Sequence, residues 1–118
     1  MAFRFRKFRV YQEAKIFHKE IASFVNGLPR EYMYLADQLR RSSLSIVLNI
    51  AEGSSKQSDK DFNRFIAMSL GSVDETMANL EISLDLKLIK PSQFRNFEIK
   101  LESLSNQLGA LSKSLRSH

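Results

Sequence analysis

The polar residues that could do chemistry in this chain lie on two segments that are otherwise apolar. On the first segment they repeat at intervals of three or four residues: Arg41, Ser45, Asn49 and Glu52. A helix would place them on one face, although residues 44–51 are apolar on nearly every other side. A charge in such a setting has to be paired. We therefore expect Arg40 or Arg41 to form an ion pair with Glu75 of the next apolar segment.

Two interpretations of this polar cluster remain open. In the first, Asn49 and Glu52 complete a structural network around the Arg–Glu75 pair and fix how the helices align, as a lone polar residue does in a coiled coil. In the second, the same residues contact a ligand or a nucleic acid. The residues assigned to the structural network are Arg40, Arg41, Asn49, Glu52 and Glu75.

Patterns typical of catalysis or metal binding are missing from the sequence. His18 and His118 are the only histidines, there is no cysteine, and no His or Glu pair has the spacing of a helical metal site. The four glycines are scattered and form no phosphate-binding loop. Glu52 and Glu75 alone fall short of a two-metal site. We therefore expect no catalytic residue, no metal and no cofactor, and a protein that is not an enzyme.

Positive charge is concentrated near the N-terminus. Residues 1–60 contain eleven Lys/Arg and six Asp/Glu, and no acidic residue precedes Glu13. Residues 1–7 are predicted to be a flexible basic arm that meets phosphate groups, and the phenylalanines among its arginines could stack on unpaired bases. The alternative is a solvated terminus that only aids solubility. The predicted nucleic-acid contacts are Arg4, Arg6, Lys7, Arg9, Lys15 and Lys19.

Apolar periodicity predicts four helices with clear breaks between them. The predicted spans are 8–26, 31 or 34–52, 58–88, and a fourth helix that follows the break at 91–92 and includes residues 94–115. Ser58 and Ser92 are the expected N-caps, and Gly53 is expected in a turn after the second helix. Since short connections make neighbouring helices antiparallel, residues 1–118 are predicted to form one all-α domain, an up-down-up-down four-helix bundle.

The second and third helices are too apolar for a single bundle. Leu70, Ile82, Leu86 and Ile89 lie off the inner stripe of the third helix. A monomer would leave several of these side chains in water. We therefore expect a homo-oligomer.

Several motifs together resemble a known family. They are Tyr11-Gln12-Glu13-Ala14, Leu28-Pro29, the run from Asp37 to Ile46, Asn49-Ile50-Ala51-Glu52-Gly53, Asp61-Phe62 with Arg64-Phe65, and Gly71-Ser72 with Glu75. They are similar to the four-helix-bundle proteins encoded in intervening sequences of bacterial 23S ribosomal RNA genes. The resemblance implies a bacterial homo-pentamer with no established catalytic activity. The family is also similar in architecture to the accessory subunit of diversity-generating retroelements, a basic barrel that binds nucleic acid and a reverse transcriptase.

These observations favour a non-enzymatic oligomeric bundle that binds RNA or DNA without sequence preference through basic residues. The alternative is a protein-interaction scaffold or adaptor with no nucleic-acid role. The uncharged run of residues 42–51, whose length no other run exceeds, is too short to span a membrane, and the lack of cysteine fits a reducing compartment. We therefore expect a cytoplasmic protein without membrane contact, whose partners are copies of itself, a nucleic acid and, in the alternative, a second protein.

Overall fold

The computed structural model describes residues 2–117, so His118 lies outside the described part of the chain. These residues form four α-helices and two short 3-10 helices, with no strand among them. In chain order the elements are η1 (Arg4–Lys7), α1 (Arg9–Val25), η2 (Arg30–Tyr32), α2 (Met33–Ser54), α3 (Asp59–Asp85) and α4 (Pro91–Arg116). The predicted all-α, four-helix fold class is confirmed.

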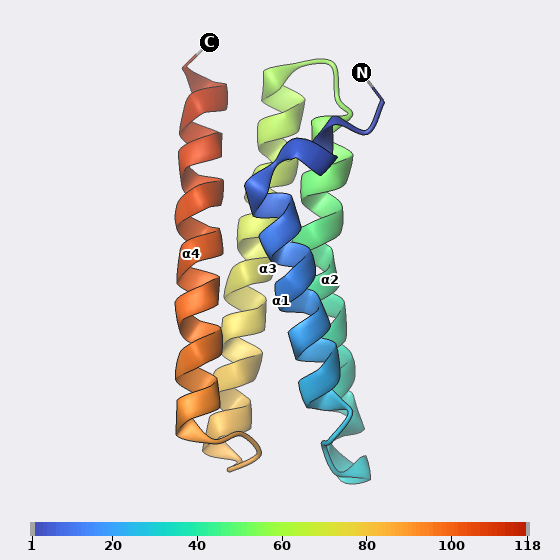
Figure 1. Ribbon diagram of the computed structural model, residues 1–118, viewed down its shortest axis with the longest axis vertical. Helices are drawn as coiled ribbons and strands as arrows, with labels where there is room; N and C mark the ends of the chain where they lie inside the picture. The colour runs from blue at the N-terminus through green and yellow to red at the C-terminus, as the bar shows by residue number, and fades with distance from the viewer. Residues whose placement is uncertain (1, 118) are drawn as a thin grey trace.

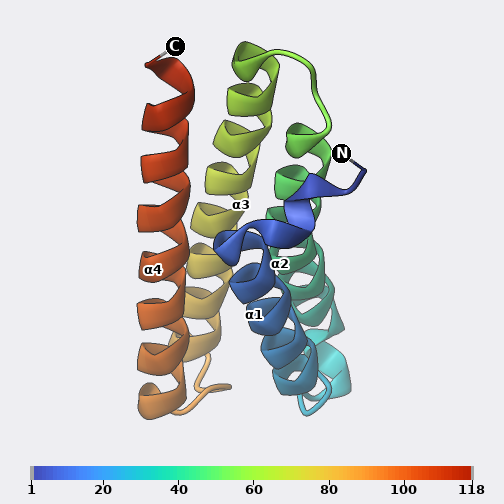
Figure 2. The same cartoon turned by 45° about the horizontal axis from the view of Figure 1, so that its top comes forward.

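The helices pack side by side into an elongated body of 46 × 22 × 19 Å. Figure 1 shows the α1–α2 and α3–α4 connections at one end and the α2–α3 connection at the other. η1 lies beside the last turns of α2, as both views show (Figure 1, Figure 2). One end of the molecule therefore gathers the N-terminal residues, the α2–α3 connection and the last turns of α4.

The core is built from the apolar stripes that the sequence predicts. Large side chains that are almost fully buried come from all four α-helices: Phe17, Ile21, Leu39, Ile46, Ile50, Ile66, Leu80, Leu101, Leu104 and Leu108. Burial of each such side chain stabilises the fold by roughly 1.5–3 kcal/mol. Between α1 and α4 the rings of Phe17 and Phe97 pack edge to face at 5.8 Å, a geometry that aromatic pairs prefer.

The predicted helix boundaries are confirmed at the start of α3 and wrong at the start of α4. Ser58 Oγ accepts a hydrogen bond from the backbone N–H of Asp61 at 3.1 Å, as an N-cap should. Ser92 is not an N-cap, because α4 already begins at Pro91 and Lys90 is its N-cap. Proline suits the first helical position, since its missing N–H would have no partner there and its φ is already helical.

α3 ends at Asp85, before the predicted limit at residue 88. The backbone N–H of Lys87 donates to the carbonyl of Leu84 at 3.0 Å, and the N–H of Leu88 donates to the carbonyl of Ser83 at 2.9 Å. Together these bonds form a Schellman motif, which satisfies the last helical carbonyls. Lys87 has a φ of 60° and occupies the left-handed position that glycine usually takes in this motif.

Gly53 lies inside a helix and not in the predicted turn, since α2 continues to Ser54. A Cβ atom at this position would lie 2.7 Å from Cβ of Phe65 and 3.0 Å from Cδ1 of Phe62. Neither distance is compatible with a normal carbon–carbon contact. The absence of a side chain at Gly53 therefore permits α2 to approach the first turns of α3 closely.

Candidate functional site

The interface between α2 and α3 is held together by small hydroxyl side chains. Oγ1 of Thr76 is 2.8 Å from Oγ of Ser42, and Oγ of Ser72 is 2.8 Å from Oγ of Ser45. Oγ of Ser69 donates to the carbonyl of Ile46, also at 2.8 Å. A signal for this hydroxyl ladder is present in the sequence, because its members recur at intervals of three or four residues on both apolar segments.

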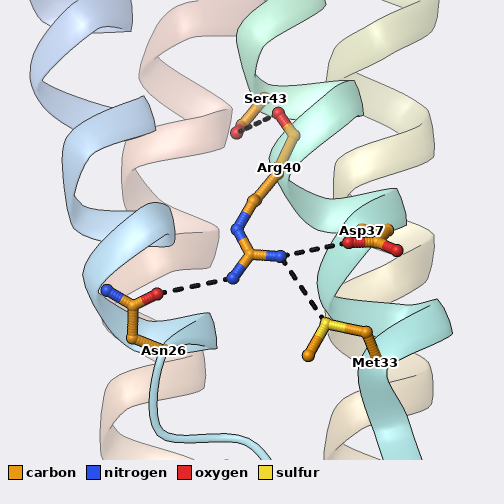
Figure 3. A network of polar contacts seen from close by, with 5 residues as sticks. All are labelled: Asn26, Met33, Asp37, Arg40 and Ser43. Carbon is orange, nitrogen blue, oxygen red and sulfur yellow. Dashed lines mark hydrogen bonds and ion pairs between the residues drawn. The ribbon is translucent and has the colours of Figure 1, made fainter.

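The predicted ion pair between Arg40 or Arg41 and Glu75 is wrong. Arg40 forms an ion pair with Asp37 at 3.1 Å and donates from Nη2 to Oδ1 of Asn26 at 3.4 Å. Figure 3 shows its guanidinium between Asn26 and Asp37. Arg41 and Glu75 are exposed, and no ion pair between described residues joins Glu75 to either arginine. Water can solvate both groups, so neither needs a buried partner.

Asn49 joins the hydroxyl ladder, whereas Glu52 does not. Nδ2 of Asn49 donates to the carbonyl of Ser45 at 2.9 Å and is 3.0 Å from Oγ of Ser45, which is itself 2.8 Å from Oγ of Ser72 on α3. Glu52 is exposed. The five residues predicted to form one internal network are therefore not brought together within the chain.

An open apolar surface lies next to these charges. Leu48 on α2 is 54% exposed and Met68 on α3 is 48% exposed, and Leu44 and Ile82 are also exposed. The hydroxyl ladder sets the register between the two helices and places Leu48 and Met68 at similar heights. We call this surface the outer α2–α3 face; it comprises Arg41, Leu44, Leu48, Glu52, Met68, Glu75 and Ile82.

The positive charge of the protein gathers at the end of the bundle that carries η1. This basic end comprises residues 2–13, 52–64 and 110–117, which Figure 1 and Figure 2 place together. Its cations are Arg4, Arg6, Lys7, Arg9, Lys56, Lys60, Arg64, Lys113 and Arg116. Against these nine stand four acids, a net charge of +5, while nine Lys/Arg and nine Asp/Glu cancel over the rest of the chain. The full net charge of the protein thus lies at one end.

Contacts between side chains hold the parts of this basic end together. The ring of Phe8 stacks on that of Phe62 with a centroid separation of 6.0 Å. Oγ of Ser112 on α4 is 2.6 Å from Oδ1 of Asn63 on α3. The sequence alone does not identify five cations of this end, because only the fold brings them to the same end as the N-terminal residues: Lys56, Lys60, Arg64, Lys113 and Arg116.

The predicted flexible arm is wrong for Arg4–Lys7, which form the 3-10 helix η1 against the bundle. Nε of Arg4 donates to the carbonyl of Ser54 at 2.6 Å. The guanidinium of Arg4 also lies over the ring of Phe62, 5.2 Å from its centroid. These contacts attach η1 to both α2 and α3.

The other predicted contact residues differ in their surroundings. Arg9 forms an ion pair with Glu13, and hydrogen bonds from Arg9 and Gln107 lower the pKa of that carboxyl group. Lys15 and Lys19 are exposed on α1, outside the basic end, and Nζ of Lys15 lies 5.1 Å from the centroid of the Tyr11 ring. Arg6 and Lys7 are exposed within η1.

Metal-binding clusters and membrane-spanning helices do not occur in the described part of the chain. Residues 2–117 contain no group of three or more His, Asp or Glu side chains arranged to hold a metal ion. None of the helices in this range has the length and apolar character needed to cross a membrane. His18 has its Nδ1 atom 2.8 Å from Oγ of Ser43, and its partial burial lowers its pKa.

Fold and surfaces together define a small four-helix protein with one basic end and one open apolar face. The family profile of the 23S rRNA-intervening sequence protein matches residues 6–110, and the chain belongs to this family. The resemblance recognised in the motifs is thereby confirmed.

A solved structure has the same fold. It is the crystal structure of a protein of unknown function from the S23 ribosomal protein family of Bacteroides thetaiotaomicron, with a TM-score of 0.83 and 24% sequence identity. The match covers 88% of this chain and 95% of that one. The comparison with curated proteins found no match.

Proposed function

We propose that this protein is a non-enzymatic, homo-pentameric bundle that binds RNA or DNA without sequence preference through its basic end. The observation that carries the proposal is the concentration of the whole net charge of +5 at that end, which η1, the α2–α3 connection and the last turns of α4 share. Such a field attracts phosphate backbones from a distance and raises the association rate.

Lysine and arginine side chains at this end would neutralise phosphates without reading base edges. Binding would therefore depend on salt more than on sequence. Arg6, Lys7, Lys60, Lys113 and Arg116 are exposed and come from η1 and the neighbouring ends of α3 and α4. No side-chain ion pair among the described residues uses them, so they remain available to phosphate oxygens.

The pentameric part of the proposal draws on the outer α2–α3 face. Exposed apolar surfaces rimmed by charges are typical of protein–protein contacts. In a ring of identical subunits, Arg41 and Glu75 would find ion-pair partners across subunit boundaries that they lack among residues 2–117 of their own chain. Several basic ends on one particle would increase the overall affinity for a long polyanion without any new contact in each subunit. A cytoplasmic location, where nucleic acid is accessible, belongs to the same proposal.

Two matched charge variants test the proposed binding. Arg6→Gln with Lys7→Gln removes two positive charges from the basic end, and Lys87→Gln with Lys90→Gln removes two from the opposite end. In gel-shift titrations over a range of salt, the first pair should weaken binding and flatten the plot of log K against log salt. The slope should change by roughly 0.9 for each duplex phosphate that the variant no longer neutralises. The second pair should behave like the unchanged protein.

The outer α2–α3 face also favours a second candidate function, a scaffold that docks another protein and has no nucleic-acid role. Here Leu48 and Met68 would form the centre of a protein interface, and the charge would serve solubility. The two functions separate at low salt, where electrostatic binding is strongest. No shift of either RNA or DNA under that condition would exclude the first function and leave the scaffold.

A further inference from the structure

Aromatic and cationic side chains form a continuous ladder over η1 and the start of α1. The guanidinium of Arg6 lies 5.0 Å from the centroid of the Phe3 ring. Phe3 meets Phe5 edge to face at 6.1 Å, and Phe5 meets Tyr11 in the same manner at 4.8 Å. Alternation of rings and cations is the composition that single-stranded nucleic acids require, since bases stack on rings and phosphates pair with cations.

Phe3 is the unusual member of this ladder. Its side chain is 60% exposed, and its backbone is left-handed with a φ of 59°. The left-handed backbone conformation is unfavourable for a large residue. Its contacts with Phe5 and Arg6 leave most of the ring open to solvent. Backbone strain of this kind is concentrated at binding sites.

A surface hollow of about 420 Å³ adjoins the Phe3 ring. Phe3 and Phe5 supply apolar wall, while Arg4 and Lys56 supply positive charge. The other lining residues are Ala2, Ser54 and Ser55. The hollow thus offers a flat aromatic surface beside two cations, within the end of the bundle that carries the net positive charge.

Arg4 is held in a position suited to a phosphate. Its Nε atom donates to the Ser54 carbonyl at 2.6 Å, and its guanidinium carbon lies 5.2 Å from the centroid of the Phe62 ring. Among the described residues, Nη1 and Nη2 have no hydrogen-bond partner. This guanidinium is already fixed through one nitrogen and can still donate from the other two. It therefore loses little conformational entropy when it binds a phosphate through two hydrogen bonds.

We infer that the hollow is a binding site for single-stranded nucleic acid, in which one unpaired base stacks on Phe3 and the adjoining phosphate binds Arg4 and Lys56. The inference rests on the proposed function and narrows its substrate to unpaired strands. In a duplex the base faces are covered by their neighbours, so only the phosphates would be accessible to this surface. Phe8 takes no part, because its ring is stacked on Phe62 inside the basic end.

The experiment separates stacking from charge by using two single strands with equal numbers of phosphates. Fluorescence anisotropy at one low salt concentration compares a short oligothymidylate with an abasic strand of the same length, and a duplex serves as a third probe. The unchanged protein should bind oligothymidylate about 5- to 150-fold more tightly than the abasic strand, the range expected for stacking of one base on an aromatic ring.

The variant Phe3→Leu keeps an apolar side chain of similar size but removes the ring. It should bind oligothymidylate as weakly as the abasic strand, with no change for the abasic or duplex probes. Phe3→Tyr keeps the ring and should preserve the preference. Tyr34→Leu is the matched control, because Tyr34 is 61% exposed but lies on α2 at the opposite end of the bundle; it should change nothing.

Each alternative outcome has a distinct meaning. Equal affinity of the unchanged protein for both single strands would overturn this inference and leave the proposed function standing. A uniform loss over all three probes in Phe3→Leu would also overturn it, because such a loss indicates a structural role for the ring. Failure of the unchanged protein to bind any probe would overturn the proposed function itself.

Discussion

Replacement of Gly53 by alanine should destabilise the protein, although glycine-to-alanine changes within helices ordinarily stabilise. Removing glycine from a helix gains at most about 1 kcal/mol, and Gly53 lies in the last turn of α2, where the gain is smaller still. Against it stands a Cβ atom 2.7 Å from Cβ of Phe65 and 3.0 Å from Cδ1 of Phe62. Because Cβ of Phe65 is attached to the backbone of α3, the clash cannot be relieved by a rotamer change.

Overpacking of this kind costs typically 1–3 kcal/mol, so the net destabilisation should be about 1–2 kcal/mol. Gly109→Ala is the matched control, since no atom lies within 4 Å of its added Cβ, and it should stabilise by roughly 0.5–1 kcal/mol. Urea denaturation at equal protein concentration measures the stability change of both variants. The midpoints are compared with the m value, the dependence of the unfolding free energy on urea, held constant. If Gly53→Ala stabilises as much as Gly109→Ala, the close approach of α2 and α3 is refuted.

Other parts of the fold lead to three more predictions. Lys87→Gly should raise the free energy of unfolding by about 1 kcal/mol, because it relieves a left-handed residue. Lys90→Gly should give no such gain, because Lys90 has an ordinary φ of −70°. Equal shifts of the melting temperature in the two variants would contradict this prediction. Burial lowers the pKa of His18 from 6.5, so the free energy of unfolding should fall as the pH drops below about 6.5 towards the folded-state pKa. His18→Gln should flatten this pH dependence. If the variant shows the same pH dependence of stability as the unchanged protein, the prediction is wrong. Leu48→Lys should reduce the mass measured by light scattering to the single-chain value of 13.6 kDa, while Asn96→Lys should leave the mass of the oligomer unchanged. A Leu48→Lys protein that keeps the mass of the oligomer would exclude the outer α2–α3 face as the subunit contact.

The fold could be predicted from the sequence because its signals are local. The spacing of Leu101, Leu104 and Leu108 determines which face of α4 is buried. Ser58 marks the start of α3 through a hydrogen bond that spans only three residues. The errors at Ser92 and Gly53 have one cause: each residue type suits two positions. Serine is common both as an N-cap and in a first turn, and glycine serves both turns and close helix contacts.

The candidate site could be predicted only in part, because it depends on rotation about helix axes and on distant segments meeting. Helical spacing alone predicts the Arg–Glu75 pair, yet the hydroxyl ladder turns Ser42 and Ser45 of α2 towards α3 and leaves Arg41 at the surface. Similarly, no sequence pattern connects Lys56 with Arg116. They lie at the same end of the bundle as η1 because the arrangement of the helices brings three chain segments there.

The two surfaces left open by the chain share only Glu52, and their different positions on the bundle decide how they could work together. The residues of the outer α2–α3 face are spread along the lengths of α2 and α3, which form one flank of the bundle. The basic end lies at one tip of the bundle (Figure 2). A contact between flanks would therefore leave the tips uncovered. In a cyclic oligomer all subunits are related by rotation about one axis, so bundles aligned with that axis would present every basic end on the same rim.

The repulsion between those basic ends would be strongest at low salt, where Debye screening is weakest. A bound polyanion would relieve it, so nucleic acid should stabilise the assembled particle against dissociation most strongly under that condition.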